Sequence, residues 1–416
     1  MERGCRVDVA IIGAGIIGIA AAYKLQEAGR SVVLIDRKGV AEETSRGSAG
    51  AFAFSDVLPM ATSGILRKLP RWVSDPLGPL TIPPAYLPSI APWLLRFWRA
   101  GWADKVQASI KAQSALMRLS AQGMASLVAS AGLQALVRTD GVLELYESEA
   151  EFAASEPGWA ARRREGIGFD HVRGADLAVL QPGLSPRLVA GTFIPQWQTV
   201  TDPYDFAMAI ADAVRSRGGT VIHAEVVGLA PHSAKVTLQL AGGDSIEAED
   251  VVVAGGAWSR ALTAPLGDPV PLETERGYNT TLPPGSFDLK RQLTFGGHGF
   301  VITPLSSGIR IGGAVELGGL KRPPNYSRAD AMLKKAKTFL PDLQTTGGRQ
   351  WMGFRPSLPD SLPAIGRSRA SPRIVYAFGH GHLGLTQSAA TGKLVAELLT
   401  GGTPSIDLTP FSPQRF

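Results

Sequence analysis

Three glycines near the start of the chain, Gly13, Gly15 and Gly18, have the spacing of a turn that binds the phosphates of a dinucleotide. Gly13 would permit the tight turn, Gly15 would let the backbone approach a pyrophosphate, and Gly18 would allow a helix to pack closely on a strand. The phosphates would lie on free N–H groups at the positive end of that helix. Asp36, 18 residues beyond Gly18, stands where an acceptor for a ribose hydroxyl is expected. The pattern predicts an adenine dinucleotide site.

The glycines need a strand before them and a helix after them, and the sequence provides both. Residues 7–12 form a short run rich in β-branched residues, as expected for a strand buried on both faces. A second strand is expected over residues 31–35, directly before Asp36. Because strand, turn, helix, second strand and acid follow in order, a dinucleotide site is a stronger interpretation than a turn without a ligand.

The composition restricts the class of protein. The chain has 416 residues, 44% of them hydrophobic, and can bury the cores of about two or three domains. Cys5 is the only cysteine, which excludes an intramolecular disulfide and a thiolate zinc cluster. The net charge of +6 comes from dispersed basic residues, so nucleic-acid binding is not expected. No apolar stretch approaches the about 20 residues that cross a bilayer, and we expect a cytoplasmic protein.

Other chemistry is not indicated. Of six histidines only His380 and His382 are close in sequence, and alone they do not form a metal site. The sequence contains no Gly-x-Ser-x-Gly turn for a nucleophilic serine.

Further helices are expected over residues 105–131, 202–216, 328–339 and 387–399, and further strands over 141–146, 220–229, 235–240, 245–253, 299–303 and 308–315.

Six ordered groups of residues resemble the FAD-dependent D-amino acid oxidase and dehydrogenase superfamily, most closely its bacterial D-amino acid dehydrogenase branch. They are residues 43–50, 91–97, 202–204, 275–278, 353–360 and 379–386. The resemblance implies an α/β fold, with a Rossmann-like FAD-binding domain built from three chain segments and an α+β substrate domain with an antiparallel sheet. The FAD-binding domain would comprise residues 1–56, 198–266 and 353–416, and the substrate-binding domain residues 57–197 and 267–352.

The C-terminal tail favours FAD over NAD. A reduced flavin carries negative charge at its pyrimidine edge, and a helix N-terminus preceded by close-approach glycines suits that charge. The family places its final helix against this edge, which implies mainly backbone contacts. The residues assigned to these contacts are Gly381, Leu383, Gly384 and Thr386.

Other residues complete the implied cofactor site. One group corresponds to the loop beside the pyrophosphate and ribityl region: Ser45, Ser48, Ala49 and Gly50. The other residues assigned to the cofactor are Arg37 after the second strand, Val226 within the strand expected over 220–229, and Gly255 and Trp258 at the glycine turn of residues 255–256. Cys5 precedes the first strand, away from the family's attachment region, so the FAD is expected to be noncovalent.

A carboxylate substrate in a dry pocket needs a charge partner, and arginine meets both oxygens with a planar fork. The resemblance assigns this role to Arg355. Tyr278, on a strand that passes beside the substrate in relatives, is expected to donate to the same carboxylate or to line the pocket, unless it only fills a sheet face. No catalytic acid or base is assigned.

The resemblance implies FAD-dependent oxidative deamination of D-amino acids. Hydride would leave Cα for flavin N5, and the imine would hydrolyse to a 2-oxo acid and ammonia, or remain cyclic with D-proline or hydroxy-D-proline. The expected electron acceptor is a quinone or an electron-transfer chain, with a peripheral contact to the inner membrane. The alternatives are a glycine or sarcosine-type amine oxidase that uses oxygen, and a non-catalytic dinucleotide-binding protein.

Overall fold

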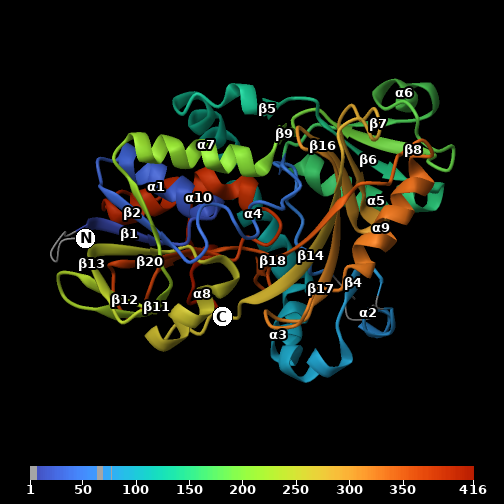
Figure 1. Cartoon of the computed structure of the whole chain (residues 1–416). Coiled ribbons are helices and arrows are strands. Elements are labelled where there is room, and N and C mark those ends of the chain that lie inside the picture. The colour runs from blue at the N-terminus through green and yellow to red at the C-terminus, as the bar shows by residue number, and fades with distance from the viewer. Residues whose placement is uncertain (1–6, 63–68, 76) are drawn as a thin grey trace.

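Two large β-sheets lie side by side in the computed structural model, which describes residues 7–62, 69–75 and 77–416 (Figure 1). The first sheet lies at the left of the view and the second at the right. Cys5, on which the expectation of noncovalent FAD depends, lies outside the described residues.

The first sheet has a parallel centre, and the strands at residues 7–12 and 32–36 in it are mainly apolar and mostly buried, as expected for such a position. Val9, Ala10 and Ile11 at its middle are fully buried. Within the described residues its strands are β1 (Val7–Ile12), β2 (Val32–Asp36), β10 (Thr220–His223), β11 (Val226–Pro231), β12 (Val236–Leu240), β13 (Ser245–Val253), β19 (Ala364–Arg367) and β20 (Ile374–Phe378). Their order is β10-β2-β1-β13-β12-β11, with β20 parallel to β13 and β19 antiparallel to β20.

Helices cover one face of this sheet, as Figure 1 shows above its strands. They are α1 (Ile16–Glu27), α4 (Ala103–Ser130), α7 (Pro203–Ser216) and α10 (Gly384–Leu399). Helix α7 begins where the side chain of Asp202 accepts a hydrogen bond from the amide of Tyr204 at 2.8 Å. Helices α1 and α10 touch backbone to backbone, because a Cβ on Gly392 would lie 2.6 Å from the carbonyl oxygen of Ala20.

The second sheet is mainly antiparallel and contributes residues to the cavity described below. Among the described residues its strands run in the order β18 (Arg349–Ser357), β14 (Glu273–Leu282), β17 (Gly308–Leu317), β16 (Phe300–Leu305), β15 (Gln292–Phe295), β6 (Val142–Tyr146), β8 (Ala190–Ile194) and β7 (Asp170–Val172), with β4 (Leu80–Thr81) beside β17. Helix α9 (Ser327–Phe339) packs Met332 and Phe339 against this sheet.

The remaining elements are short or peripheral. A small sheet joins β3 (Ala51–Phe52), β9 (Gln198–Val200) and β5 (Val137–Arg138). The other α-helices of the described chain are α2 (Leu69–Ser74), α3 (Leu87–Ala100), α5 (Glu149–Arg164), α6 (Gly174–Leu180) and α8 (Ser259–Thr263).

The predicted α/β class and the antiparallel second sheet are confirmed, with parallel pairs only at β15–β6 and β17–β4 within the described part of that sheet. The helices α3, α5 and α6 were not predicted. Two of them contain a proline in the helix interior, Pro92 in α3 and Pro157 in α5, and an interior proline disfavours a helix. The proposed domain division stays a prediction, and its limit at residue 353 falls inside β18.

The contact between α1 and α10 leads to a prediction about stability. Gly392→Ala gains about 1 kcal/mol of helix propensity, but a methyl group 2.6 Å from a backbone oxygen forces the helices apart, which costs about 1–3 kcal/mol or more. We expect a lower midpoint of thermal unfolding by calorimetry. Gly242→Ala, whose added Cβ meets no atom within 4 Å, is the control. A Gly392→Ala midpoint equal to or above that of the parent would contradict the packing argument.

Candidate active site

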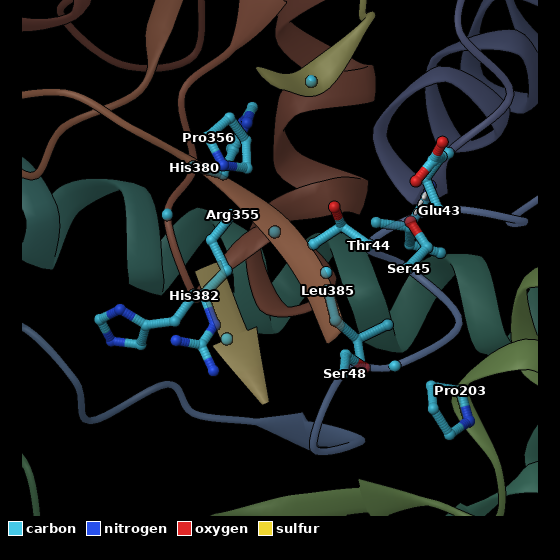
Figure 2. A pocket seen from close by; sticks show the side chains of 18 of the residues that line it. Glu43, Thr44, Ser45, Ser48, Pro203, Arg355, Pro356, His380, His382 and Leu385 are labelled. Atoms are coloured by element: carbon cyan, nitrogen blue, oxygen red, sulfur yellow. Dashed lines mark hydrogen bonds between the residues drawn. The ribbon is translucent and has the colours of Figure 1, made fainter. Parts of the chain in front are cut away.

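A cavity of about 610 Å³ is lined by residues of both sheets and reaches from Asp36 to Arg355. This volume suits a small-molecule ligand, whose pockets span about 300–1,000 Å³. Figure 2 shows Thr44, Ser45 and Ser48 on one side and Arg355 with His382 on the other. The predicted site residues that line it are Gly13, Gly15, Asp36, Arg37, Ser45, Ser48, Ala49, Gly50, Val226, Gly255, Trp258, Tyr278, Arg355, Gly381, Leu383 and Gly384. Gly18 and Thr386 are not among the residues found to line it.

The first glycine turn is shaped by backbone contacts. Gly13 has a φ of +106°, and a Cβ there would lie 2.4 Å from the carbonyl oxygen of Ala254. A Cβ on Gly18 would lie 1.9 Å from the carbonyl oxygen of Gly13. Gly18 therefore packs the helix onto the turn without facing the cavity. Gly15 is the N-cap of α1 and lines the cavity, so the helix N-terminus with its partial positive charge lies at the cavity wall.

Asp36 has its carboxylate fixed by three backbone amides. Oδ2 accepts from Ala14 at 2.8 Å, and Oδ1 accepts from Lys38 at 2.8 Å and Gly39 at 3.0 Å. Each oxygen offers two lone-pair directions, so a ribose hydroxyl can still donate to this carboxylate.

Arg37 forms the neighbouring wall of the cavity with Trp258. Its guanidinium lies 3.9 Å from the centroid of the indole ring and pairs with Glu43 at 2.8 Å. Trp258 also packs edge-on against Phe354, with ring centroids 5.5 Å apart. These contacts give Trp258 a packing role at the cavity wall.

The loop of residues 44–50 joins the two halves of the cavity. The hydroxyl of Ser45 accepts a hydrogen bond from the amide of Ile16 at 2.9 Å, at the N-terminus of α1. From the second sheet, Arg310 donates to the carbonyl of Ser48 at 2.7 Å, and Asn279 donates to the carbonyl of Gly47 at 3.0 Å. Sequence reasoning missed Arg310 and Asn279, because neither stands in a recognisable motif.

Arg355 reaches the cavity from β18. Its guanidinium lies across Gly277 of β14, where a Cβ would be 2.4 Å from Cζ. One N–H donates to the carbonyl of Ala314 at 3.1 Å, and no other residue of the described chain accepts from it. Burial lowers the pKa of Arg355, and the charge of Glu275 partly offsets this effect. The guanidinium is thus charged, half-buried and open to an anionic ligand.

The hydroxyl of Tyr278 does not take the expected substrate role. It donates to Glu316 at 2.6 Å and accepts from the amide of Asn325 at 3.1 Å, and burial raises the pKa of Tyr278 to about 12. Successive residues of a strand point to opposite faces, so Tyr278 packs on the face opposite to Gly277. The expectation of a hydrogen bond to the substrate carboxylate is therefore corrected, although Tyr278 does contribute to the cavity lining.

Two histidines of the C-terminal turn differ in environment. His380 is buried, its Nε2 lies 3.0 Å from the hydroxyl of Thr391, and burial lowers its pKa to about 3. His382 is exposed, and its Nε2 lies 3.0 Å from the carboxylate of Asp56. Desolvation of the ring by its surroundings opposes its charge, but the hydrogen bond and the charge of Asp56 outweigh this effect and raise the pKa of His382. Sequence reasoning did not find Asp56, which lies far from His382 in the chain.

The final helix presents its N-terminus to the cavity. Gly381, Leu383 and Gly384 line it there, and Gly381 has a φ of +54°. Thr386 was also predicted as a site residue, but it does not line the cavity. Its hydroxyl is hydrogen-bonded to the backbone at β3. It accepts from the amide of Ala53 at 3.0 Å and donates to the carbonyl of Ala51 at 3.2 Å.

FAD fits these features. The bare glycine turns admit a pyrophosphate, the two helix N-termini supply partial positive charge, and Asp36 can accept from a ribose. Within the described residues no group of three or more metal-binding side chains comes together. No helix in that part of the chain combines the length and apolarity needed to span a membrane.

Relatives of known name match the chain over nearly its whole length. It is 36% identical to a D-amino-acid oxidase of Bradyrhizobium diazoefficiens, with 98% of each chain covered. It is 28% identical to a D-amino acid dehydrogenase of Rhizobium johnstonii, with 99% of this chain and 100% of the relative covered.

Solved structures show the same fold. A glycine oxidase from Geobacillus kaustophilus superposes with a TM-score of 0.79 at 23% identity, with 99% of each chain covered. An L-proline dehydrogenase from P. horikoshii superposes with a TM-score of 0.74 at 19% identity, with 99% and 98% covered. The family model described as FAD dependent oxidoreductase matches residues 8–398. The chain belongs to this family of FAD-dependent oxidoreductases.

Proposed function

We propose that this oxidoreductase deaminates D-amino acids at the Arg355 end of the cavity. The observation that carries the proposal is the guanidinium of Arg355, which is half-buried and hydrogen-bonded by one N–H to Ala314. An amino acid carboxylate is the planar anion that such a fork binds through two bonds. The names of the relatives, D-amino-acid oxidase and D-amino acid dehydrogenase, support an amino acid substrate of D configuration.

The residues that would hold FAD are distributed from one end of the cavity to the other. Asp36 and Arg37 would hold the adenosine end, and the amides that follow Gly15 would face the pyrophosphate. The loop at residues 44–50 and the N-terminus of α10 would hold the flavin end. Bound FAD supplies an acceptor for a hydride, that is, for two electrons and one proton. Noncovalent attachment remains part of this proposal.

The protein's own contribution is to orient the substrate. Arg355 fixes the carboxylate, which leaves Cα–H free to point along the cavity. The neutral amine R–CH(NH2)–COO⁻ loses hydride from Cα, and its lone pair forms the second C–N bond of R–C(=NH2⁺)–COO⁻. Water then gives R–CO–COO⁻ and NH4⁺. A ring substrate such as D-proline or hydroxy-D-proline would leave a cyclic imine instead.

The electron acceptor separates the proposed dehydrogenase from an oxidase. The dehydrogenase relatives favour a quinone or an electron-transfer chain, and the oxidase relative favours oxygen. A panel of D- and L-amino acids, assayed with a dye acceptor and again with oxygen alone, tests substrate, stereochemistry and acceptor together. Turnover of glycine or sarcosine but of no D-amino acid would favour the glycine-type alternative. A peripheral membrane contact and a cytoplasmic location stay predictions.

Arg355→Ala should abolish the carboxylate contact. Leaving a desolvated carboxylate unpaired costs about 3 kcal/mol, so we expect kcat/KM for a D-amino acid to fall by about a hundredfold or more. Arg349→Ala, an exposed arginine of the same strand, is the matched control and should retain parent kinetics. Parent-like steady-state kinetics in Arg355→Ala would refute the assigned role.

Asp36→Ala should weaken FAD binding. A hydrogen bond from a ribose hydroxyl to a charged acceptor contributes about 1.5–3 kcal/mol, so the Kd for FAD should rise by about tenfold or more. Fluorescence titration of the apoprotein with FAD measures it. Asp212→Ala, at an exposed position of α7, controls for the loss of one negative charge. An unchanged Kd in Asp36→Ala would remove Asp36 from the cofactor site.

A further inference from the structure

Glu275 is a buried carboxylate that faces the same cavity as Arg355. Glu275 is 3% exposed and lies directly opposite Arg355 in the antiparallel pairing of β14 with β18. Side chains of such a cross-strand pair project from the same face of the sheet, with Cβ atoms about 4.5–5.5 Å apart. Both residues line the cavity, and the guanidinium of Arg355 lies over Gly277, the next residue of β14 on that face.

The carboxylate of Glu275 is not satisfied by the protein. It forms no hydrogen bond and no ion pair with any residue of the described chain, and Arg355 donates instead to the carbonyl of Ala314. Other acids of the same sheet are engaged: Glu273 accepts from Tyr86 at 3.0 Å, and Glu316 accepts from Tyr278 at 2.6 Å. Buried charges are normally paired, so an unpaired one at a cavity wall points to a cationic ligand group.

Another acid near this end of the cavity is already occupied. Asp56 pairs with His382 at 3.0 Å and lies 3.8 Å from Arg162. Glu275, in contrast, forms no ion pair within the described part of the chain, and its charge acts on Arg355 and His382 only from a longer distance.

We propose that Glu275 binds the α-ammonium group of the substrate while Arg355 binds its carboxylate. The inference rests on the proposed function and extends it, because it defines the substrate as a zwitterion held by two opposite charges on adjacent strands. An amino acid carries its carboxylate and ammonium on one carbon, and the two strands place a cation and an anion next to one another on one face. Glu275 is a substrate-binding residue in this scheme.

The proton balance of the reaction is consistent with binding of the ammonium group by Glu275. The bound ammonium R–CH(NH3⁺)–COO⁻ must lose one proton before its nitrogen lone pair can form the iminium bond. The carboxylate of Glu275 can take that proton, becoming a carboxylic acid, and release it to solvent after the iminium ion leaves. No further reactant is required.

The test compares two ligands that differ by one group. D-alanine has both charges, and propionate lacks the ammonium. The FAD-loaded protein is titrated with each ligand under anaerobic conditions and without added acceptor, and the flavin absorbance gives a Kd. For D-alanine, stopped-flow mixing separates binding from flavin reduction. We expect Glu275→Gln to weaken D-alanine about tenfold or more, and to leave propionate unchanged or bound more tightly, because one like-charge contact is removed.

Glu273→Gln is the matched control, since it changes a neighbouring acid of the same strand that is satisfied by Tyr86, and both affinities should stay within about twofold. Arg355→Ala should weaken both ligands. Equal losses for D-alanine and propionate in Glu275→Gln would indicate a structural role and overturn the inference, as would unchanged D-alanine affinity.

The proposed function fails by a different result. If the parent protein turns over no D-amino acid in the panel, the substrate assignment is wrong whatever Glu275 does. If the parent oxidises D-alanine and Glu275→Gln retains its affinity, only the ammonium site is wrong. Restoration of D-alanine affinity by Glu275→Asp, relative to Glu275→Gln, would further support a charge contact.

Discussion

The position of the Arg355 guanidinium, partly buried but open to the cavity, is the constraint on which this end of the cavity depends. Arg355 can extend along the sheet only because Gly277 carries no side chain. The carbonyl that anchors it belongs to Ala314, whose φ of 51° is uncommon for a residue with a Cβ. The pairing of β14 with β17 shifts register between Arg276 and Tyr278, beside this anchor. A local irregularity of the sheet thus aims a backbone oxygen at the arginine.

The two sheets act on one cavity because polar side chains tie the intervening loop to both. Ser45 contacts the N-terminus of α1, while Arg310 and Asn279 of the second sheet hold the carbonyls of the same loop. Thr386 adds a second tie, from α10 to β3. Burial lowers the pKa of Arg310, so its hydrogen bonds to carbonyl oxygens are formed in a partly desolvated setting, where they are stronger. Displacing this loop would disturb the phosphate end and the substrate end together.

The sequence predicted those features that depend on residues close together in the chain. The turn at Gly13 and Gly18 is local, and Asp36 ends the next strand, so spacing alone placed them. Arg355 was assigned from a resemblance, and its geometry agrees with an anion-binding role. The hydroxyl of Tyr278 was misjudged because strand parity decides which face a side chain takes, and parity follows from pairing. Glu275 gains meaning only from its register with β18, which no local pattern encodes.

The charges at the substrate end also bear on selectivity. Arg355 and Glu275 lie on adjacent strands but form no ion pair, so neither neutralises the other fully, although each is partly removed from water. The charge of Glu275 favours the charged form of Arg355 in the free protein, and a zwitterionic ligand would add an opposite charge to each of the two groups. A ligand with only a carboxylate would place its negative charge next to an unpaired Glu275. A ligand with only an amine would leave Arg355 unpaired. The site would then select amino acids over such analogues partly because each analogue leaves Arg355 or Glu275 unpaired. Buried polar sites reject close analogues in this way.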